Sequence, residues 1–231
     1  SDWSSDVCTS DLIIMPKPTF FNLPEEKRKQ IIDECFREFS LNAYEQASIT
    51  TIVNRLCIAK GSIYQYFENK KELWVYLKET AEQTKMQFIK DIDRNSFKDF
   101  WSYYRALYAN GIQFDLKYPD QSLFLYKSGT SENSPEVKEY LDSWKKKAGI
   151  MFEKWVEHEK KSGGFNKKLP TKLIVHTLLT MSISIKDLLE DQFGLDFEKN
   201  IRSGKSLFGK NEKEIMEAAD QLILIMKKAL E

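Results

Sequence analysis

The sequence predicts an all-α protein of about nine helices. Apolar residues recur at three- and four-residue spacing through most of its length, which is the pattern of helices with one buried face. No stretch alternates between apolar and polar residues for long enough to form a strand. Pro24, Pro135 and Pro170 each precede an apolar-periodic segment, as is typical of the first turn of a helix. With 231 residues and 42% hydrophobic content, the chain can bury a large core.

Two short amphipathic segments follow a predicted helix over residues 24–41. The first begins after Ser48, whose hydroxyl can cap it. Its apolar stripe consists of Ile49, Ile52, Val53 and Leu56. A short turn, CIAK, leads to a second segment over residues 60–67, in which Ile63 and Phe67 share one buried face. Its other side carries Lys60, Gly61, Ser62, Tyr64, Gln65 and Tyr66. Hydrogen-bond donors along the free side of so short a helix are typical of a helix-turn-helix that reads DNA in the major groove.

The stretch FxxFSLNAYEQASITTIVNRLCIAKGSIYQYFENKKEL resembles the N-terminal DNA-binding domain of the TetR/AcrR family of bacterial transcriptional regulators. The match is densest over KGSIYQYFENKKEL, residues 60–73. Ala43 and Cys57 stand where the family usually has Gly, and Ala59 stands where a Ser or Thr usually caps the reading helix. The first two place a Cβ where glycine relieves strain, and the third removes a cap worth about 1 kcal/mol.

The resemblance and the free helix face together predict the DNA contacts. These residues are Ser48, Thr50, Lys60, Gly61, Ser62, Tyr64, Gln65, Tyr66 and Lys70. Gln65 can read an adenine edge, whereas Ser48, Tyr66 and Lys70 suit phosphates. An ordinary solvated helix face is the simpler alternative, but two tyrosines expected to be exposed so close together argue against it. Residues 48–71 include four basic residues and one acidic residue in a chain of zero net charge, which fits phosphate contacts confined to one end.

Aromatic residues gather between positions 97 and 155, within the region 71–231 that is predicted to form a helical C-terminal domain. As the resemblance implies, this region encloses a pocket for a small apolar or amphipathic effector. The predicted effector-binding residues are Trp101, Tyr104, Phe114, Phe124, Trp144, Trp155 and His176. Tyr104 and His176 would supply its polar groups. For any one of the aromatic residues, packing in the core is the simpler explanation.

The last two predicted helices carry more apolar surface than one domain needs. The run LIVHTLLTMSISI is apolar on nearly all sides, but its thirteen residues fall short of the roughly 20 that span a bilayer. In the C-terminal helix, one stripe consists of Ile215, Ala219, Leu222, Met226 and Ala229, and an adjacent stripe consists of Met216, Ile223 and Leu230. Two stripes predict two burial partners, the helix's own domain and a second subunit. The resemblance implies a homodimer through these two helices, the eighth and ninth of the nine.

The N-terminal residues 1–14 look extraneous to the domain, because Met15 followed by Pro-Lys-Pro reads as a natural start. Neither the basic nor the apolar part of a signal peptide is present in this segment. Cys8, Cys35 and Cys57 lack disulfide or zinc-site spacing. Cys35 and Cys57 lie on apolar faces, so both are expected to be buried free thiols, as in a cytoplasmic protein.

No catalytic or cofactor-binding constellation stands out in the sequence. His158 and His176 have no cysteine or carboxylate at metal-ligand spacing. The SGKS at residues 203–206 has Lys199 where a phosphate loop needs glycine, and no strand precedes it. The sequence therefore predicts no metal, no cofactor and no enzyme.

These observations predict a cytoplasmic, ligand-responsive repressor that binds a palindromic operator as a homodimer, has no membrane partner and is released by a small apolar or aromatic effector. Residues 15–70 would bind DNA, and residues 71–231 would bind the effector and dimerise. Two alternatives stay open. One is a DNA-binding regulator controlled by a protein partner. The other is a helical enzyme that uses the aromatic pocket, which the lack of a catalytic constellation disfavours.

Overall fold

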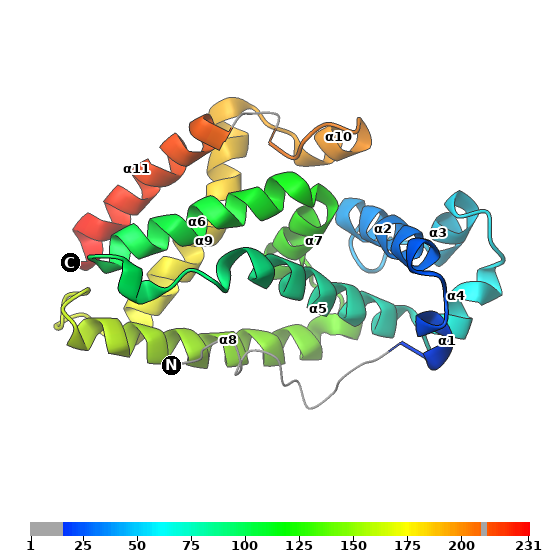
Figure 1. The fold of residues 1–231 in the computed structure, drawn as a ribbon, viewed down its shortest axis with the longest axis horizontal. Helices are drawn as coiled ribbons and strands as arrows, with labels where there is room; N and C mark the ends of the chain where they lie inside the picture. The colour runs from blue at the N-terminus through cyan, green and yellow to red at the C-terminus, as the bar shows by residue number, and fades with distance from the viewer. Residues whose placement is uncertain (1–15, 209–211) are drawn as a thin grey trace. The chain divides into compact units, whose positions relative to one another are not determined.

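The computed structural model describes residues 16–208 and 212–231, and these residues form eleven α-helices and one 3-10 helix without strands (Figure 1). The all-α prediction is confirmed. The expected number of about nine is exceeded by two short helices, α1 (Pro18–Phe21) and α10 (Phe197–Arg202). The segment predicted to be extraneous, residues 1–14, lies outside the described residues.

The chain divides into two compact units. Unit 1 contains the described residues up to Thr84 and residues 118–142, and unit 2 contains residues 85–117 and 143–231. The elements of unit 1 are α1, α2 (Glu25–Leu41), α3 (Ile49–Arg55), α4 (Lys60–Tyr66), most of α5 (Lys70–Ile89), α7 (Pro119–Thr130) and the start of α8 (Pro135–Lys161). The elements of unit 2 are the rest of α5 and α8, η1 (Arg94–Ser96), α6 (Phe100–Lys117), α9 (Thr171–Phe193), α10 and α11 (Glu212–Leu230).

The core of unit 1 is built around Phe124 of α7, which packs against α2 and α5. Its ring centroid lies 5.8 Å from that of Phe36 and 5.4 Å from that of Trp74, both with edge-on geometry that aromatic rings favour. We predicted that Phe124 lines one pocket with Trp101 and Tyr104. This prediction was wrong, because Phe124 belongs to the core of unit 1, whereas Trp101 and Tyr104 belong to the core of unit 2. Chain order alone does not say that the α7 helix packs on α2.

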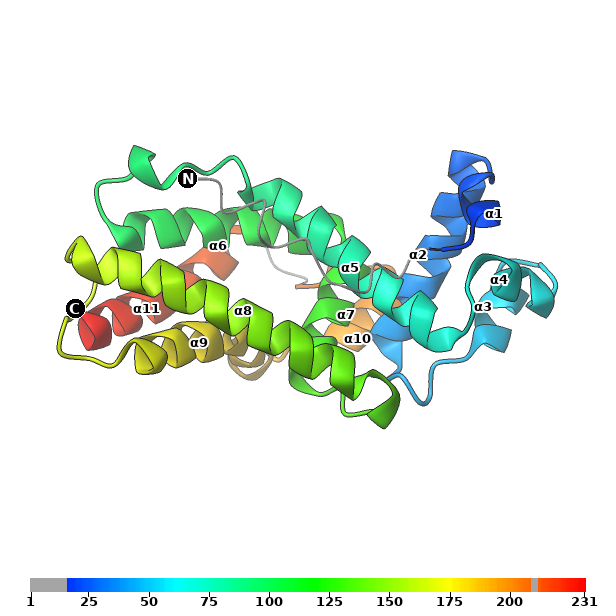
Figure 2. The same cartoon turned by 90° about the horizontal axis from the view of Figure 1, so that it is seen from below.

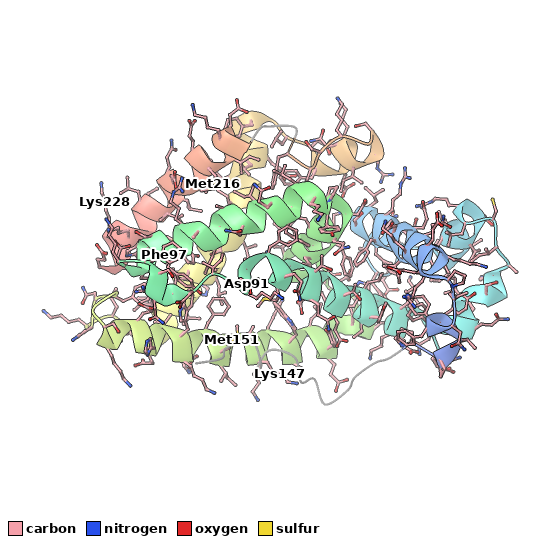
Figure 3. All side chains as sticks on the ribbon, viewed as in Figure 1. Asp91, Phe97, Lys147, Met151, Met216 and Lys228 are labelled. Atoms are coloured by element: carbon pink, nitrogen blue, oxygen red, sulfur yellow. The ribbon has the colours of Figure 1, made fainter. Side chains whose placement is uncertain are left out.

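The core of unit 2 is centred on the buried ring of Phe100. This ring stacks on Tyr104 at 5.4 Å and meets Trp155 at 5.1 Å and Phe165 at 4.5 Å. The α11 helix lies beside both α6 and α9 and closes this core (Figures 1 and 2). Figure 3 draws the described side chains on the ribbon, with Met151 of α8 and Met216 of α11 labelled in this unit.

The two apolar stripes of α11 differ from their predicted roles. The stripe with Met216, Ile223 and Leu230 is buried within the chain, so it is not a surface reserved for another subunit. Ala229, expected on the inner stripe, is exposed. The large apolar residues that α11 exposes are Leu224 and Ile225. No helix in the part of the chain that the structure describes is long and apolar enough to cross a membrane.

Candidate DNA-binding surface

The α3 helix begins where the sequence predicts it. The hydroxyl oxygen of Ser48 accepts a hydrogen bond from the backbone N–H of Thr51 at 3.2 Å, which satisfies one of the free donors of the first turn. Ile49, Ile52 and Val53 point into the core of unit 1. The hydroxyl of Ser48 thus has a structural role, and its contact with DNA stays a prediction.

The free side of α4 presents polar groups to solvent. Lys60, Gly61 and Gln65 are exposed, Tyr64 is 40% exposed, and Ser62 is half-buried. Ile63 and Phe67 are buried beneath this surface, as predicted. Thr50, at the start of α3, is also exposed.

Tyr66 does not lie on the free side of α4, so its predicted placement there was wrong. The residue is only 7% exposed, and its ring packs 5.9 Å from the ring of Phe20. Residues three apart share a helix face, so Tyr66 follows the buried Ile63 into the core. Tyr64 is consequently the exposed tyrosine of α4.

Lys70 is the first residue of α5. The preceding residue, Asn69, caps this helix, because its side-chain oxygen accepts a hydrogen bond from the N–H of Glu72 at 2.9 Å. The ammonium of Lys70 lies 3.4 Å from the carbonyl oxygen of Glu45 and 4.7 Å from the centre of the Tyr44 ring. Partial burial lowers the pKa of Lys70 from its usual value, although nearby acidic groups oppose the shift. These contacts hold the ammonium at one edge of the helix-turn-helix.

The basic residues of this region are not equally available to phosphates. Arg55 pairs with Glu34 at 3.3 Å and with the buried Glu38. Its charge is therefore already compensated within the chain, which leaves Lys60 and Lys70 as the basic residues among the predicted DNA contacts.

The three departures from the family pattern have different consequences. Cys57 has a φ of 53° and is the one non-glycine residue in the left-handed region among those described, so glycine would relieve strain in this turn. Ala43 does not have a positive φ, so the prediction of strain at this residue was wrong. Ala59 provides no side-chain cap to α4, as predicted. Cys35 is buried as expected, but Cys57 is exposed, because the turn carries its side chain away from the core.

Of the predicted effector-binding residues, Trp101, Tyr104 and Trp155 come together in the core of unit 2. The hydroxyl of Tyr104 hydrogen-bonds with the Ser182 hydroxyl and lies 3.4 Å from the Leu178 carbonyl oxygen, and burial raises its pKa well above the usual range.

The indole Nε1 of Trp101 is buried without a hydrogen-bond partner in the described part of the chain. A buried donor without an acceptor is costly unless water or a ligand reaches it.

The other predicted effector-binding residues are more scattered. Phe114 is buried and packs 5.9 Å from Phe88, and Trp144 is half-buried on α8. His176 is exposed, so its predicted place among the pocket residues was wrong. A helix that is apolar on nearly all sides does not reveal which side faces solvent, and His176 falls on the exposed one. His158 is exposed as expected.

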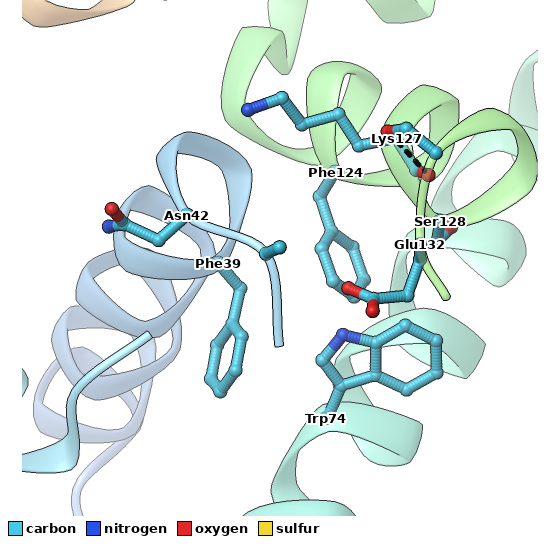
Figure 4. Close-up of a pocket in the computed structure, with 9 residues that line it drawn as sticks. Phe39, Asn42, Trp74, Phe124, Lys127, Ser128 and Glu132 are labelled. Atoms are coloured by element: carbon cyan, nitrogen blue, oxygen red, sulfur yellow. Dashed lines mark hydrogen bonds between the residues drawn. The ribbon is translucent and has the colours of Figure 1, made fainter. Parts of the chain in front are cut away.

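A small cavity lies in unit 1, and of the predicted effector-binding residues only Phe124 lines it. Its volume is about 70 Å³, and its lining includes the aromatic rings of Phe39, Trp74 and Phe124 and the polar side chains of Asn42, Lys127 and Glu132 (Figure 4). Ligand pockets usually measure several hundred Å³, so this cavity suits a few water molecules. The described residues contain no group of three or more histidine, cysteine or acidic side chains that could hold a metal ion.

The α3–turn–α4 unit, with its free helix face, defines a helix-turn-helix DNA-binding protein. Residues 31–77 match the family described as bacterial regulatory proteins, tetR family. A TetR family transcriptional regulator from Chloroflexus aurantiacus J-10-FL has a similar structure, with a TM-score of 0.76 and 29% identity over 94% of this chain and 98% of that one. These findings show that residues 31–77 form a TetR-type DNA-binding domain and that the chain has the fold of a TetR family transcriptional regulator.

More distant solved structures share the fold. FadR from Bacillus subtilis, solved with stearoyl-CoA, has a TM-score of 0.61 and 14% identity over 86% of this chain and 96% of that one. AibR, solved with isovaleryl coenzyme A and operator DNA, has a TM-score of 0.54 and 15% identity over 69% of this chain and 85% of that one. None of the functionally curated proteins matches the chain in sequence.

Proposed function

We propose that this regulator is a homodimeric repressor whose α4 helix reads a palindromic operator. The observation that carries the proposal is the exposure of Tyr64 and Gln65 next to each other on α4, above a buried base of Ile63 and Phe67. An amide side chain can bond to the N6 and N7 atoms of adenine, which makes Gln65 the residue that selects a base. The regulator would act in the cytoplasm, where bacterial DNA lies.

The other contacts fix the protein on the DNA backbone. Lys60, Lys70 and the hydroxyls of Ser48, Thr50 and Ser62 are assigned to phosphates, and Gly61 allows the backbone of α4 to come close to the groove. Phosphate contacts position a protein without selecting a sequence. We assign DNA binding to residues 15–70, and effector binding and dimerisation to residues 71–231.

The dimer would form through α9 and α11. Five of the residues that α9 exposes follow a helical stripe of three- and four-residue steps, which consists of Leu173, His176, Thr180, Ile183 and Asp187. Leu224 and Ile225 are exposed on α11, which packs against α9. Exposed apolar side chains on two adjacent helices favour burial against a second copy. The two α4 helices of the dimer would then lie ~34 Å apart, one helical turn of DNA.

The effector is assigned to the core of unit 2, near Trp101, Tyr104 and Tyr108. A small apolar or aromatic molecule with a hydrogen-bond acceptor would satisfy the unpartnered Nε1 atom of Trp101. Acyl thioesters are the first compounds to test, since FadR and AibR were solved with such molecules. The effector can release DNA only by binding more tightly to the dimer that does not fit the operator.

Selection of bound sequences from a random DNA pool tests the proposed function. We expect a palindrome whose half-sites lie about 10 base pairs apart, centre to centre. Binding to the selected sequence should weaken when an acyl thioester is added. A pool that yields no common sequence, or a single half-site bound by a monomer, would contradict the proposal.

A further inference from the structure

The N-terminal segment Lys17–Thr19 holds the C-terminal end of α4. Its contacts are with the backbone of Tyr64 and Gln65, the residues proposed to face the DNA. A helix leaves its last four carbonyl oxygens without partners in the helix. In α4 these belong to Ile63, Tyr64, Gln65 and Tyr66. The carbonyl oxygen of Ile63 accepts a hydrogen bond at 2.9 Å from the N–H of Phe67, the first residue after α4.

The remaining three carbonyl oxygens are all satisfied by Lys17 and Thr19. The ammonium of Lys17 donates to the Tyr64 oxygen at 3.1 Å, and its backbone N–H donates to the Tyr66 oxygen at 2.8 Å. The hydroxyl of Thr19 donates to the Gln65 oxygen between them. Three consecutive carbonyl groups are thus fixed by one short segment more than forty residues away in sequence.

The segment is itself anchored. Phe20 is fully buried, and its ring lies 5.2 Å from that of Phe67 and 5.8 Å from that of Tyr76. The ammonium of Lys17 also pairs with the Glu68 carboxylate at 2.8 Å and lowers its pKa. A cation is favourable at a helix C-terminus, where the partial charge is negative.

The α4 helix needs such support because it is short and poorly capped. It has seven residues, fewer than an isolated helix requires, and Ala59 offers no cap at its other end. We infer that Lys17 and Thr19 are positioning residues for DNA reading: they fix the backbone of Tyr64 and Gln65 so that both side chains meet the base edges in register. This inference rests on the proposed function of α4.

Two variants remove these contacts, one at the exposed Thr19 and one at the half-buried Lys17. Thr19→Val removes the donated hydrogen bond and keeps the shape of the side chain, whereas Thr19→Ser keeps the hydroxyl. Lys17→Met removes the ammonium and keeps the backbone N–H. Thr130→Val is the matched control, because the Thr130 hydroxyl donates to the Tyr126 carbonyl at 2.8 Å in the last turn of α7.

The experiment measures affinity for the selected operator and for random DNA over a range of salt concentrations. It also measures hydrogen–deuterium exchange of residues 60–67 in the free protein. Thr19→Val and Lys17→Met should each lower the ratio of specific to random binding by roughly three- to tenfold, as expected for one lost hydrogen bond. Exchange in residues 60–67 should rise, the salt dependence should stay unchanged, and Thr19→Ser and Thr130→Val should behave like the wild type.

Two results would overturn the inference. In the first, Thr19→Val matches the wild type in both the binding ratio and the exchange of residues 60–67. In the second, Lys17→Met weakens specific and random binding equally and lowers the salt slope by about one, which would make Lys17 a phosphate contact instead. A wild-type protein without sequence preference would contradict the proposed function, and the exchange measurement would still decide whether the segment holds α4.

Discussion

The Oε1 atom of Glu38 accepts a hydrogen bond from the backbone N–H of Ser48 at 3.0 Å, so the last turn of α2 is tied to the residue that opens α3. The same oxygen accepts from the Asn42 amide at 3.2 Å, and the other carboxylate oxygen accepts from Arg55 at the end of α3. Glu38 is only 3% exposed. One buried carboxylate thereby fixes both ends of the first helix of the helix-turn-helix.

Glu38→Ala should lower the free energy of unfolding by about 1–2 kcal/mol, because the Ser48 N–H loses its acceptor and Arg55 keeps only Glu34 as a partner. Urea unfolding followed by circular dichroism measures the change. Glu139→Ala, an exposed site on α8, should change stability by less than about 0.5 kcal/mol. Equal losses in the two variants would show that Glu38 does not organise this region.

Replacement of the strained residue in the turn between α3 and α4 should stabilise the protein. Cys57→Gly removes the Cβ at a φ of 53°, and the lost strain should outweigh the greater freedom of glycine in the unfolded chain, for a gain of roughly 0.5 kcal/mol. Thermal unfolding measures the shift. Cys57→Ala is the control, because it removes the thiol and keeps the Cβ. A glycine variant no more stable than the alanine variant would contradict the strain argument.

Asp120 makes a pH-dependent contribution to stability. Burial raises the pKa of its carboxyl above the usual value, although the Ser40 hydroxyl, which donates to it at 3.2 Å, opposes the shift. A carboxyl with a raised pKa in the folded state favours folding most at low pH and loses this contribution as the pH rises through the folded pKa. Asp120→Asn should therefore become more stable than the wild type as the pH rises from below the ordinary carboxyl pKa to neutrality.

Unfolding by urea at several pH values, compared between the two proteins, measures this trend. A stability difference that stays constant with pH would mean that Asp120 does not titrate differently in the folded and unfolded states.

The proposed dimer surface predicts that a charge placed on α11 lowers the mass of the protein in solution. Ile225→Glu places a charge on the exposed face of α11 and should convert a dimer into monomers, because an unpaired charge in an apolar interface is costly. Ile150→Glu is the matched control, since Ile150 on α8 is similarly exposed at 49% compared with 58% for Ile225. Sedimentation velocity measures both. A dimer that withstands Ile225→Glu but not Ile150→Glu would place the interface on α8.

The helix-turn-helix could be predicted from sequence because its signals are local. The Ser48 cap, the stripe of Ile52 and Val53 and the residues of α4 lie within a few turns of one another, where helical spacing governs burial. Tyr66 lies three residues after Ile63, so the same helical spacing places Tyr66 on the buried side of α4.

Other features could not be predicted because they depend on contacts distant in sequence. The helix α1 has four residues, and its function as a support for α4 comes from hydrogen bonds across 46 and 47 positions. The core to which Phe124 belongs is decided by the packing of α7 on α2. Pattern alone also could not show which side of α9 would carry His176 to the surface.

A coupling measurement tests whether Gln65 reads a base. Each base pair of the selected operator is changed in turn, and affinity is measured for the wild type, for Gln65→Ala and for Gln30→Ala, an exposed control on α2. We expect Gln65→Ala to abolish the preference at one base pair in each half-site, worth about 1–3 kcal/mol, and to leave the others intact. If Gln65→Ala keeps every base preference of the wild type, Gln65 does not read a base.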